Sequence, residues 1–229
     1  MIDIHAHVLP FVDDGSKSLE RSIEIVKNSI LQGVSDMVLT PHFDQDYKSS
    51  KEELETAFNT FVEHVNALGL NVNLYLGQEI FVSSDVKKLV SSGNILTLND
   101  TEYILIEFSV GEDFDIAEAV YEFRKAGYKP IVAHFERYPY ADISVAEEIK
   151  SLGGLIQVNS DSLVGKGRYR HLRKVKSLFK EGFVDFVASD IHEFRKNSLK
   201  KAQEYVAKKY GKKVADAVFI NNAKEIIKG

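Results

Sequence analysis

The sequence predicts an α/β protein in which short parallel strands alternate with helices and form an irregular seven-stranded (β/α) barrel. Runs such as residues 155–158 and 183–188 are almost continuously apolar, as expected of strands that are buried on both faces. The segments between the strands carry apolar residues at helical spacing, and this alternation favours parallel pairing. No linker or repeat interrupts the pattern, so we expect one domain over residues 1–229.

The first helix illustrates the helical signal. Between Ser18 and Gln32, apolar residues recur every three or four positions, and Gly33 follows as a glycine at a helix C-terminus should. The same reasoning predicts further helices near residues 51–68, 85–91, 115–126, 145–152, 171–180 and 198–210, and a terminal helical stretch from Val214.

Residues of the kind that bind metal ions stand where the strands end. His5 and His7 lie two apart on the first strand, so both imidazoles can face the same side, and Asp190 and His192 repeat this spacing near the end of the chain. The carboxyl ends of barrel strands converge on one face. A single histidine at such a position is more often structural, but several together with carboxylates predict a polynuclear metal centre; the other strand-end residues are His42, Glu79, Glu107 and His134.

Composition excludes several classes of protein. The 229 residues are 44% hydrophobic and 28% charged with a net charge of −5, and the lysines and arginines are dispersed, so we expect no nucleic-acid partner. No apolar stretch is long enough to span a bilayer and no signal peptide is apparent, so we expect a cytoplasmic protein without direct membrane insertion. Cysteine is absent, which removes disulfides, thiolate metal sites and a cysteine nucleophile.

These motifs resemble those of the polymerase and histidinol phosphatase (PHP) superfamily, and within it the bacterial capsule and exopolysaccharide tyrosine phosphatases. The resemblance covers the whole chain and rests on residues 1–7, 12–15, 33–34, 40–42, 77–79, 106–108, 134–138 and 189–192. It implies a barrel of the PHP type and a manganese-dependent protein-tyrosine phosphatase. The family often has proline after the histidine that corresponds to His134, whereas this chain has Phe135.

Carried over residue by residue, the resemblance implies three divalent ions. It places the first on His5, His7, Glu79 and Asp190, the second on Glu79, Glu107 and His134, and the third on Asp14, His42 and His192. Nitrogen and oxygen donors without sulfur suit manganese, iron or zinc, and the family implies manganese most readily. Three divalent ions carry more positive charge than the four carboxylates neutralise, so the centre favours a phosphate dianion.

The expected reaction is hydrolysis of a phosphate ester without a covalent intermediate. A metal-bridging hydroxide would be the nucleophile, and the ions would neutralise charge on the phosphoryl oxygens. Arg137 and Arg195 each follow a predicted ligand by three residues, where a guanidinium can hold phosphate oxygens. The alternative for each arginine is a surface salt bridge.

The resemblance further implies that the substrate is the tyrosine-phosphorylated tail of a bacterial kinase that regulates capsule or exopolysaccharide synthesis. One alternative is a small-molecule phosphomonoesterase of the histidinol phosphate type, which would share the metal centre. Another, from a different class, is a non-catalytic metal-containing module that binds a kinase. The sequence does not indicate the oligomeric state or a general acid.

Overall fold

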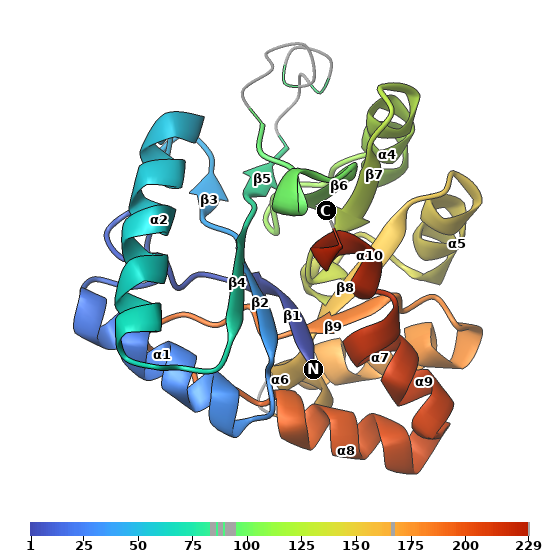
Figure 1. Cartoon of the computed structure of the whole chain (residues 1–229). Coiled ribbons are helices and arrows are strands. Elements are labelled where there is room, and N and C mark those ends of the chain that lie inside the picture. The colour runs from blue at the N-terminus through green and yellow to red at the C-terminus, as the bar shows by residue number, and fades with distance from the viewer. Residues whose placement is uncertain (83–85, 87–88, 90–94, 166–167, 229) are drawn as a thin grey trace.

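A computed structural model describes residues 1–82, 86, 89, 95–165 and 168–228 (Figure 1). The strands form the centre of the molecule and the longer helices surround them. The strands are β1 (Ile2–Ala6), β2 (Asp36–Leu39), β3 (His42–Phe43), β4 (Asn73–Leu76), β5 (Glu79–Phe81), β6 (Tyr103–Glu107), β7 (Lys129–Val132), β8 (Leu155–Asn159) and β9 (Phe186–Ala188).

All pairings between the named strands are parallel, in the orders β1-β2-β4 and β3-β5-β6-β7-β8-β9. Two short breaks separate β2 from β3 and β4 from β5, yet backbone hydrogen bonds continue across them, since Thr40 N donates to Ala6 O (2.9 Å) and Glu79 N to Pro41 O (3.1 Å). Pro41 has no N–H to give to a ladder, which accounts for the first break. If β2 with β3 and β4 with β5 are each counted as one strand, the described residues contain the seven strands that the sequence predicts.

Contact between the first and last strands completes the circuit. It is not a continuous ladder but an isolated parallel bridge between Ala6 and Ile191, beyond the end of β9. Asp190 N donates to His5 O (2.9 Å) and His7 N donates to Ile191 O (3.0 Å). The barrel is therefore irregular, as expected, and its weakest pairing lies beside predicted metal ligands.

The helices agree with the predicted segments to within about two residues at most ends. They are α1 (Leu19–Leu31), α2 (Lys51–Ala67), α4 (Ile116–Lys125), α5 (Ile143–Ser151), α6 (Ser160–Leu163), α7 (Tyr169–Glu181), α8 (Leu199–Tyr210), α9 (Lys212–Asp216) and α10 (Lys224–Ile227), with short turns η1 (Leu98–Asp100), η2 (Phe135–Arg137) and η3 (Ala217–Asn221). The helix expected at residues 85–91 lies mostly outside the described residues. In the described part of the chain, no helix combines the length and apolar character needed to cross a bilayer.

Local sequence explains where several helices begin and end. Ser50 and Glu53 form a reciprocal capping box at the start of α2. The carboxylate of Asp142 accepts backbone N–H groups at the start of α5. Gly182 ends α7 in the left-handed conformation with φ +73°, which costs glycine no side-chain strain.

The buried apolar residues form two groups. The larger packs the helices against the strands and includes Val26, Phe61, Phe123 and Val175. The smaller contains residues of five strands and of α10, so it fills the inside of the barrel; its strand members are Ile2, Ile4, Val38, Leu105, Ile131, Phe186 and Ala188. Because side chains two apart share a face of a strand, residues further along the same strands face the barrel mouth.

Candidate metal centre

The predicted ligands converge at the carboxyl ends of the strands. On β6 and on the segment after β9, the inward face that carries Leu105 and Ala188 continues to Glu107 and Asp190. The register of β1 against β2 shifts between Asp3 and Ala6, an irregularity that re-aims side chains next to functional sites. His5 lies in this shifted stretch.

Glu79 is the centre of the cluster. Its Oε2 lies 3.2 Å from His5 Nε2 and 3.1 Å from His7 Nε2, and its Oε1 lies 2.8 Å from His134 Nε2. The same Oε2 is 3.2 Å from His42 Nδ1. One buried carboxylate therefore faces four imidazoles, as expected of a ligand that bridges ions.

Two further carboxylates flank Glu79. Glu107 lies 3.2 Å from His42 Nδ1 and 3.6 Å from His134 Nε2, while Asp190 Oδ1 lies 3.7 Å from His5 Nε2 and 3.8 Å from His7 Nε2. These contacts define three ligand groups within the described residues: His5, His7 and Asp190; His5, Glu79 and His134; and His42, Glu79 and Glu107.

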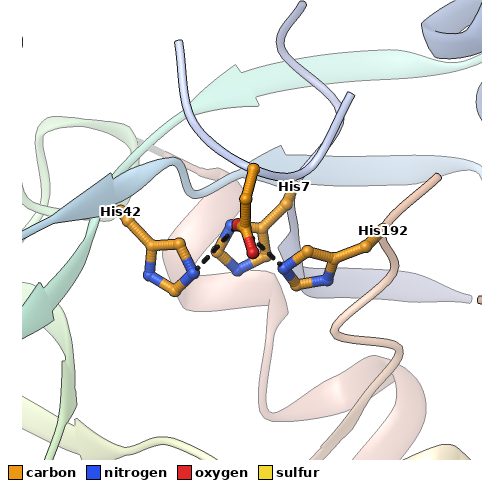
Figure 2. A group of neighbouring side chains, drawn as sticks. His7, His42 and His192 are labelled. Atoms are coloured by element: carbon orange, nitrogen blue, oxygen red, sulfur yellow. Dashed lines mark ion pairs between the residues drawn. The ribbon is translucent and has the colours of Figure 1, made fainter. Parts of the chain in front are cut away.

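The outer part of the cluster contains His7, Asp14, His42 and His192. Figure 2 shows the three imidazoles pointing toward one another. Asp14 Oδ1 lies 3.5 Å from His42 Nε2 and 3.4 Å from His192 Nε2, and the Asp14 side chain is 49% exposed. A neutral imidazole has one lone pair, so His42 can serve this group or the one with Glu79 and Glu107, but not both at once.

Hydrogen bonds behind the cluster fix which nitrogen atoms can bind a metal. Asp13 Oδ2 lies 2.8 Å from His7 Nδ1, and a carboxylate at that distance holds the proton on Nδ1. Gln157 Oε1 accepts from His134 N (2.8 Å) and lies 3.1 Å from His5 Nδ1, while its amide nitrogen donates to Asn159 Oδ1 (2.8 Å). In the neutral rings of His5 and His7, the lone pair is therefore on Nε2.

The consequence is a set of donor atoms whose arrangement calls for positive charge. His5 Nε2 and His7 Nε2 lie 3.0 Å apart, and two lone pairs at that distance repel unless a proton or a metal ion lies between them. Among the described residues, four buried side-chain atoms have no hydrogen-bond partner, and two of them, His42 Nδ1 and Glu79 Oε2, belong to this cluster. Buried polar atoms are rarely left unpaired, so these donors fit divalent metal ions.

The pKa values describe the same need for positive charge. Burial by itself lowers the pKa of His7, but the carboxylates of Asp13 and Glu79 raise this pKa well above its usual range. Despite burial and the nearby Arg137, Glu107 and Glu79 raise the pKa of His134 to about 9. Although burial works the other way, His5 and His134 hold the pKa of Glu79 well below normal. The carboxylates thus favour positive charge at these imidazoles, and binding of metal ions there would displace protons.

Two cluster residues have an unusual backbone. His134 has φ +31° and Asp190 has φ +48°, in the left-handed region that non-glycine residues seldom adopt. Such strain tends to persist at functional sites, where the surroundings enforce it. Gly15 has a related role, because a Cβ at this position would lie 2.3 Å from His7 Cβ. The loop that carries Asp13 and Asp14 can approach His7 only with glycine there.

Arg137 and Arg195 both lie beside the cluster and both contact Asp190. Arg137 Nη1 lies 3.2 Å from Asp190 Oδ2, and Arg195 Nη1 lies 2.6 Å from the same oxygen and donates to Asp190 O at 2.7 Å. Their side chains are 32% and 27% exposed. Neither arginine is on the open surface, and their role toward a phosphate stays a prediction.

The sequence analysis missed three residues that support the ligands: Asp13, Gln157 and Asn159. Gln157 and Asn159 are alternate polar residues in the otherwise apolar β8, and this spacing is a signal that could have identified them. Asn159 Nδ2 donates to Asp190 Oδ2 at 2.7 Å. For Asp13, only its place in the motif at residues 12–15 gave any indication.

Comparison with known proteins places the chain in a family. It belongs to the capsular polysaccharide synthesis CpsB/CapC family, whose model matches residues 1–228. It is 32% identical over 239 residues to the tyrosine-protein phosphatase CpsB of Streptococcus agalactiae serotype V, covering 100% of this chain and 98% of that protein. It is 31% identical over 199 residues to the tyrosine-protein phosphatase YwqE of Bacillus subtilis, covering 85% and 78%.

Solved structures agree with this assignment. A chain from the crystal structures of Bacillus subtilis YwqE and Streptococcus pneumoniae CpsB, described as unique metal-dependent tyrosine phosphatases, matches with a TM-score of 0.86 and 29% identity, covering 94% of this chain and 90% of that one. Histidinol phosphate phosphatase from Lactococcus lactis matches with a TM-score of 0.58 and 16% identity, covering 93% of each chain, and shares the fold alone. The predicted family and the predicted fold class are confirmed.

Proposed function

We propose that this protein is a metal-dependent phosphotyrosine-protein phosphatase, formed by one domain over residues 1–229. The observation that carries the proposal is the convergence of nine nitrogen- and oxygen-donor side chains, with Glu79 at their centre, beside two arginines. Relatives over the full length of the chain are named tyrosine-protein phosphatases, which supports the substrate class.

The proposed ligand sets are those implied by the resemblance. His5, His7, Glu79 and Asp190 hold one ion, Glu79, Glu107 and His134 a second, and Asp14, His42 and His192 a third; manganese is the proposed metal, with iron or zinc as alternatives. When bound, divalent ions neutralise charge on the phosphoryl group and lower the pKa of coordinated water. Asp13 and Gln157 hold the imidazoles of His7 and His5 with Nε2 facing the ions.

Arg137 and Arg195 are proposed to position the phosphate. Each guanidinium carries five N–H donors in a planar fork, and the recorded contacts with Asp190 use Nη1 of each arginine. The Asp190 carboxylate thereby orients both forks at the edge of the cluster. Further donors of the same groups suit phosphate oxygens in the two-pronged geometry that arginine favours.

Phosphotyrosine is the proposed substrate partly because of its leaving group. A phenol has a pKa near 10, well below that of an alkyl alcohol, so its departure depends less on a general acid. We propose that the physiological substrate is the phosphorylated tail of a bacterial kinase in capsule or exopolysaccharide synthesis, consistent with the family's description. A flexible tail can reach the barrel mouth without unfolding its own domain.

The decisive test is turnover of p-nitrophenyl phosphate and of a phosphotyrosine peptide by chelator-treated protein, before and after addition of Mn²⁺, together with analysis of bound metal. We expect no turnover before addition, recovery after it, and no inhibition by iodoacetamide, because the chain has no cysteine. Turnover by metal-free protein would contradict the proposed chemistry. Metal binding without turnover would favour the non-catalytic kinase-binding module, and a preference for histidinol phosphate over the peptide would favour the small-molecule phosphatase.

A further inference from the structure

Phe194 is a large apolar side chain at the edge of the metal centre that the proposed chemistry does not explain. It is 71% exposed, yet it lies two residues after the proposed ligand His192. Its ring centroid is 5.5 Å from that of His192, and the guanidinium carbon of Arg195 is 5.7 Å from the Phe194 centroid. One exposed ring thus contacts both a proposed ligand and a proposed phosphate-binding residue.

Tyr47 has an equivalent position on the neighbouring imidazole. Its ring stacks on that of His42, with centroids 6.1 Å apart and planes inclined by 21°. His42 and His192 are themselves 6.1 Å apart and share the half-exposed carboxylate of Asp14. Each of the two imidazoles beside Asp14 therefore has an aromatic ring next to it.

We infer that Phe194 and Tyr47 form an aromatic rim that contacts the aryl group of the phosphate ester and makes the enzyme selective for aryl over alkyl phosphates. The inference rests on the proposed phosphatase function. A phosphate held at the cluster and by Arg195 must direct its ester substituent outward, past Asp14, the half-exposed member of the outer group of ligands. A phenyl substituent there can bury part of the Phe194 ring and pack against it in an edge-to-face or offset arrangement.

The geometry favours a ring over an alkyl chain as the occupant. A phenyl group offers a rigid flat surface and two faces, and aromatic pairs gain attraction beyond the area that they bury. A serine-derived ester has a single methylene at the same place, which offers no aromatic face to pair with the rim. The contact between the Arg195 guanidinium and the Phe194 ring does not explain why this exposed ring lies at the metal centre, because such a contact can form anywhere on the surface.

The test measures binding, so it does not depend on turnover. Affinities for phenylphosphonate and methylphosphonate are measured by calorimetry on the Mn²⁺-loaded protein, its metal content checked, for the unaltered chain, Phe194→Leu and Tyr47→Leu. The matched control is Tyr121→Leu on α4, because Tyr121 is also an exposed ring (46%) with a cation, Lys125 Nζ, 6.0 Å from its centroid.

We expect Phe194→Leu to weaken phenylphosphonate binding roughly 2- to 10-fold, the scale of one aromatic contact, with methylphosphonate unchanged. Tyr47→Leu should act in the same direction and Tyr47→Phe should retain the unaltered affinity, while Tyr121→Leu changes neither ligand. Unchanged affinities for both phosphonates in both leucine variants overturn the inference. An equal loss for both phosphonates also overturns it, since the ring would then serve only to hold His192 or Arg195. Failure of the unaltered protein to hydrolyse any aryl phosphate is a separate result that refutes the proposed function.

Discussion

Replacement of Asp13 by asparagine isolates the hydrogen bond that prepares His7 for metal binding. The carboxylate accepts three N–H groups, with Oδ2 facing His7 Nδ1 (2.8 Å) and His42 N (3.1 Å) and Oδ1 facing Gly15 N (2.9 Å). An asparagine has only one acceptor oxygen, so its NH₂ group must oppose at least one of these donors. Asp13→Asn keeps the size of the side chain and removes the match between its acceptor oxygens and the three N–H donors.

The size of the effect follows from these contacts. If the asparagine turns its NH₂ toward His7, the imidazole can pair with it only by moving its proton to Nε2, which removes the lone pair that faces Glu79 and Asp190. Hydrogen bonds to charged groups contribute about 1.5–3 kcal/mol, which corresponds to roughly a 10- to 100-fold loss of metal affinity, and changes behind metal ligands cost a similar factor. We therefore expect Mn²⁺ to bind the variant roughly 10- to 100-fold more weakly.

The assay is a Mn²⁺ titration followed by calorimetry and by activation of p-nitrophenyl phosphate hydrolysis. Asp142→Asn is the matched control, because Asp142 also accepts backbone N–H groups, from Ser144 (2.8 Å) and Val145 (3.3 Å), but at an exposed helix start where asparagine serves equally well. Thermal unfolding of both variants in chelator separates loss of metal binding from loss of folding. Unaltered Mn²⁺ affinity in Asp13→Asn would refute the reasoning.

Three further predictions concern Arg137, the bound metal ions and Lys174. Arg137→Ala should retain its metal but lose roughly 10- to 1000-fold in kcat/KM, with Arg173→Ala on the exposed side of α7 as control; unchanged kinetics at normal metal content would remove Arg137 from the site. Mn²⁺ at about 100 times its Kd should stabilise the fold by about 2.7 kcal/mol and raise Tm by roughly 5–10 °C, and chelation should reverse the shift, whereas an unmoved Tm would show that the folded state does not bind the ion. Burial lowers the pKa of Lys174 to about 8. Above that pH the unfolded chain therefore binds more protons than the native state, and the native state gains stability as pH rises toward the unfolded pKa. In urea unfolding, the stability of the unaltered protein relative to Lys174→Met should increase from pH 8 to pH 10, and a constant or falling difference would contradict the shift.

Much of the fold and of the cluster could be predicted because two simple periodicities control them. Apolar residues every three or four positions identified the long helices, and residues two apart on a strand share a face. Glu107 follows Leu105 and Asp190 follows Ala188 on the inward face, so their convergence with His5 required only that parallel strands end together. The structure brings all the predicted metal ligands into the ligand groups at the barrel mouth.

The parts that the sequence could not resolve have no such period. Asp13 and Asp14 are adjacent in an irregular loop. The close approach at Gly15 and the hydrogen bonds of the Asp13 carboxylate together bury Asp13 against His7, while Asp14 stays half exposed. The interruption between β2 and β3 depends on tertiary hydrogen bonds around Pro41, and the single turn of α6 is too short to show a helical repeat.

Register between the first and last strands links the fold to the site. Asp3 is fully buried, and its carboxylate accepts both Ser189 N (3.0 Å) and the Ser189 hydroxyl (2.6 Å). These bonds and the one from Asp190 N to His5 O fix the two ends of the chain against each other at one register. A slip of one residue would turn alternate side chains to the opposite face and move Asp190 and His192 away from His5 and His7. The closing contact of the barrel is therefore also the contact that assembles the ligands, which explains why a buried carboxylate outside the ligand groups is placed next to them.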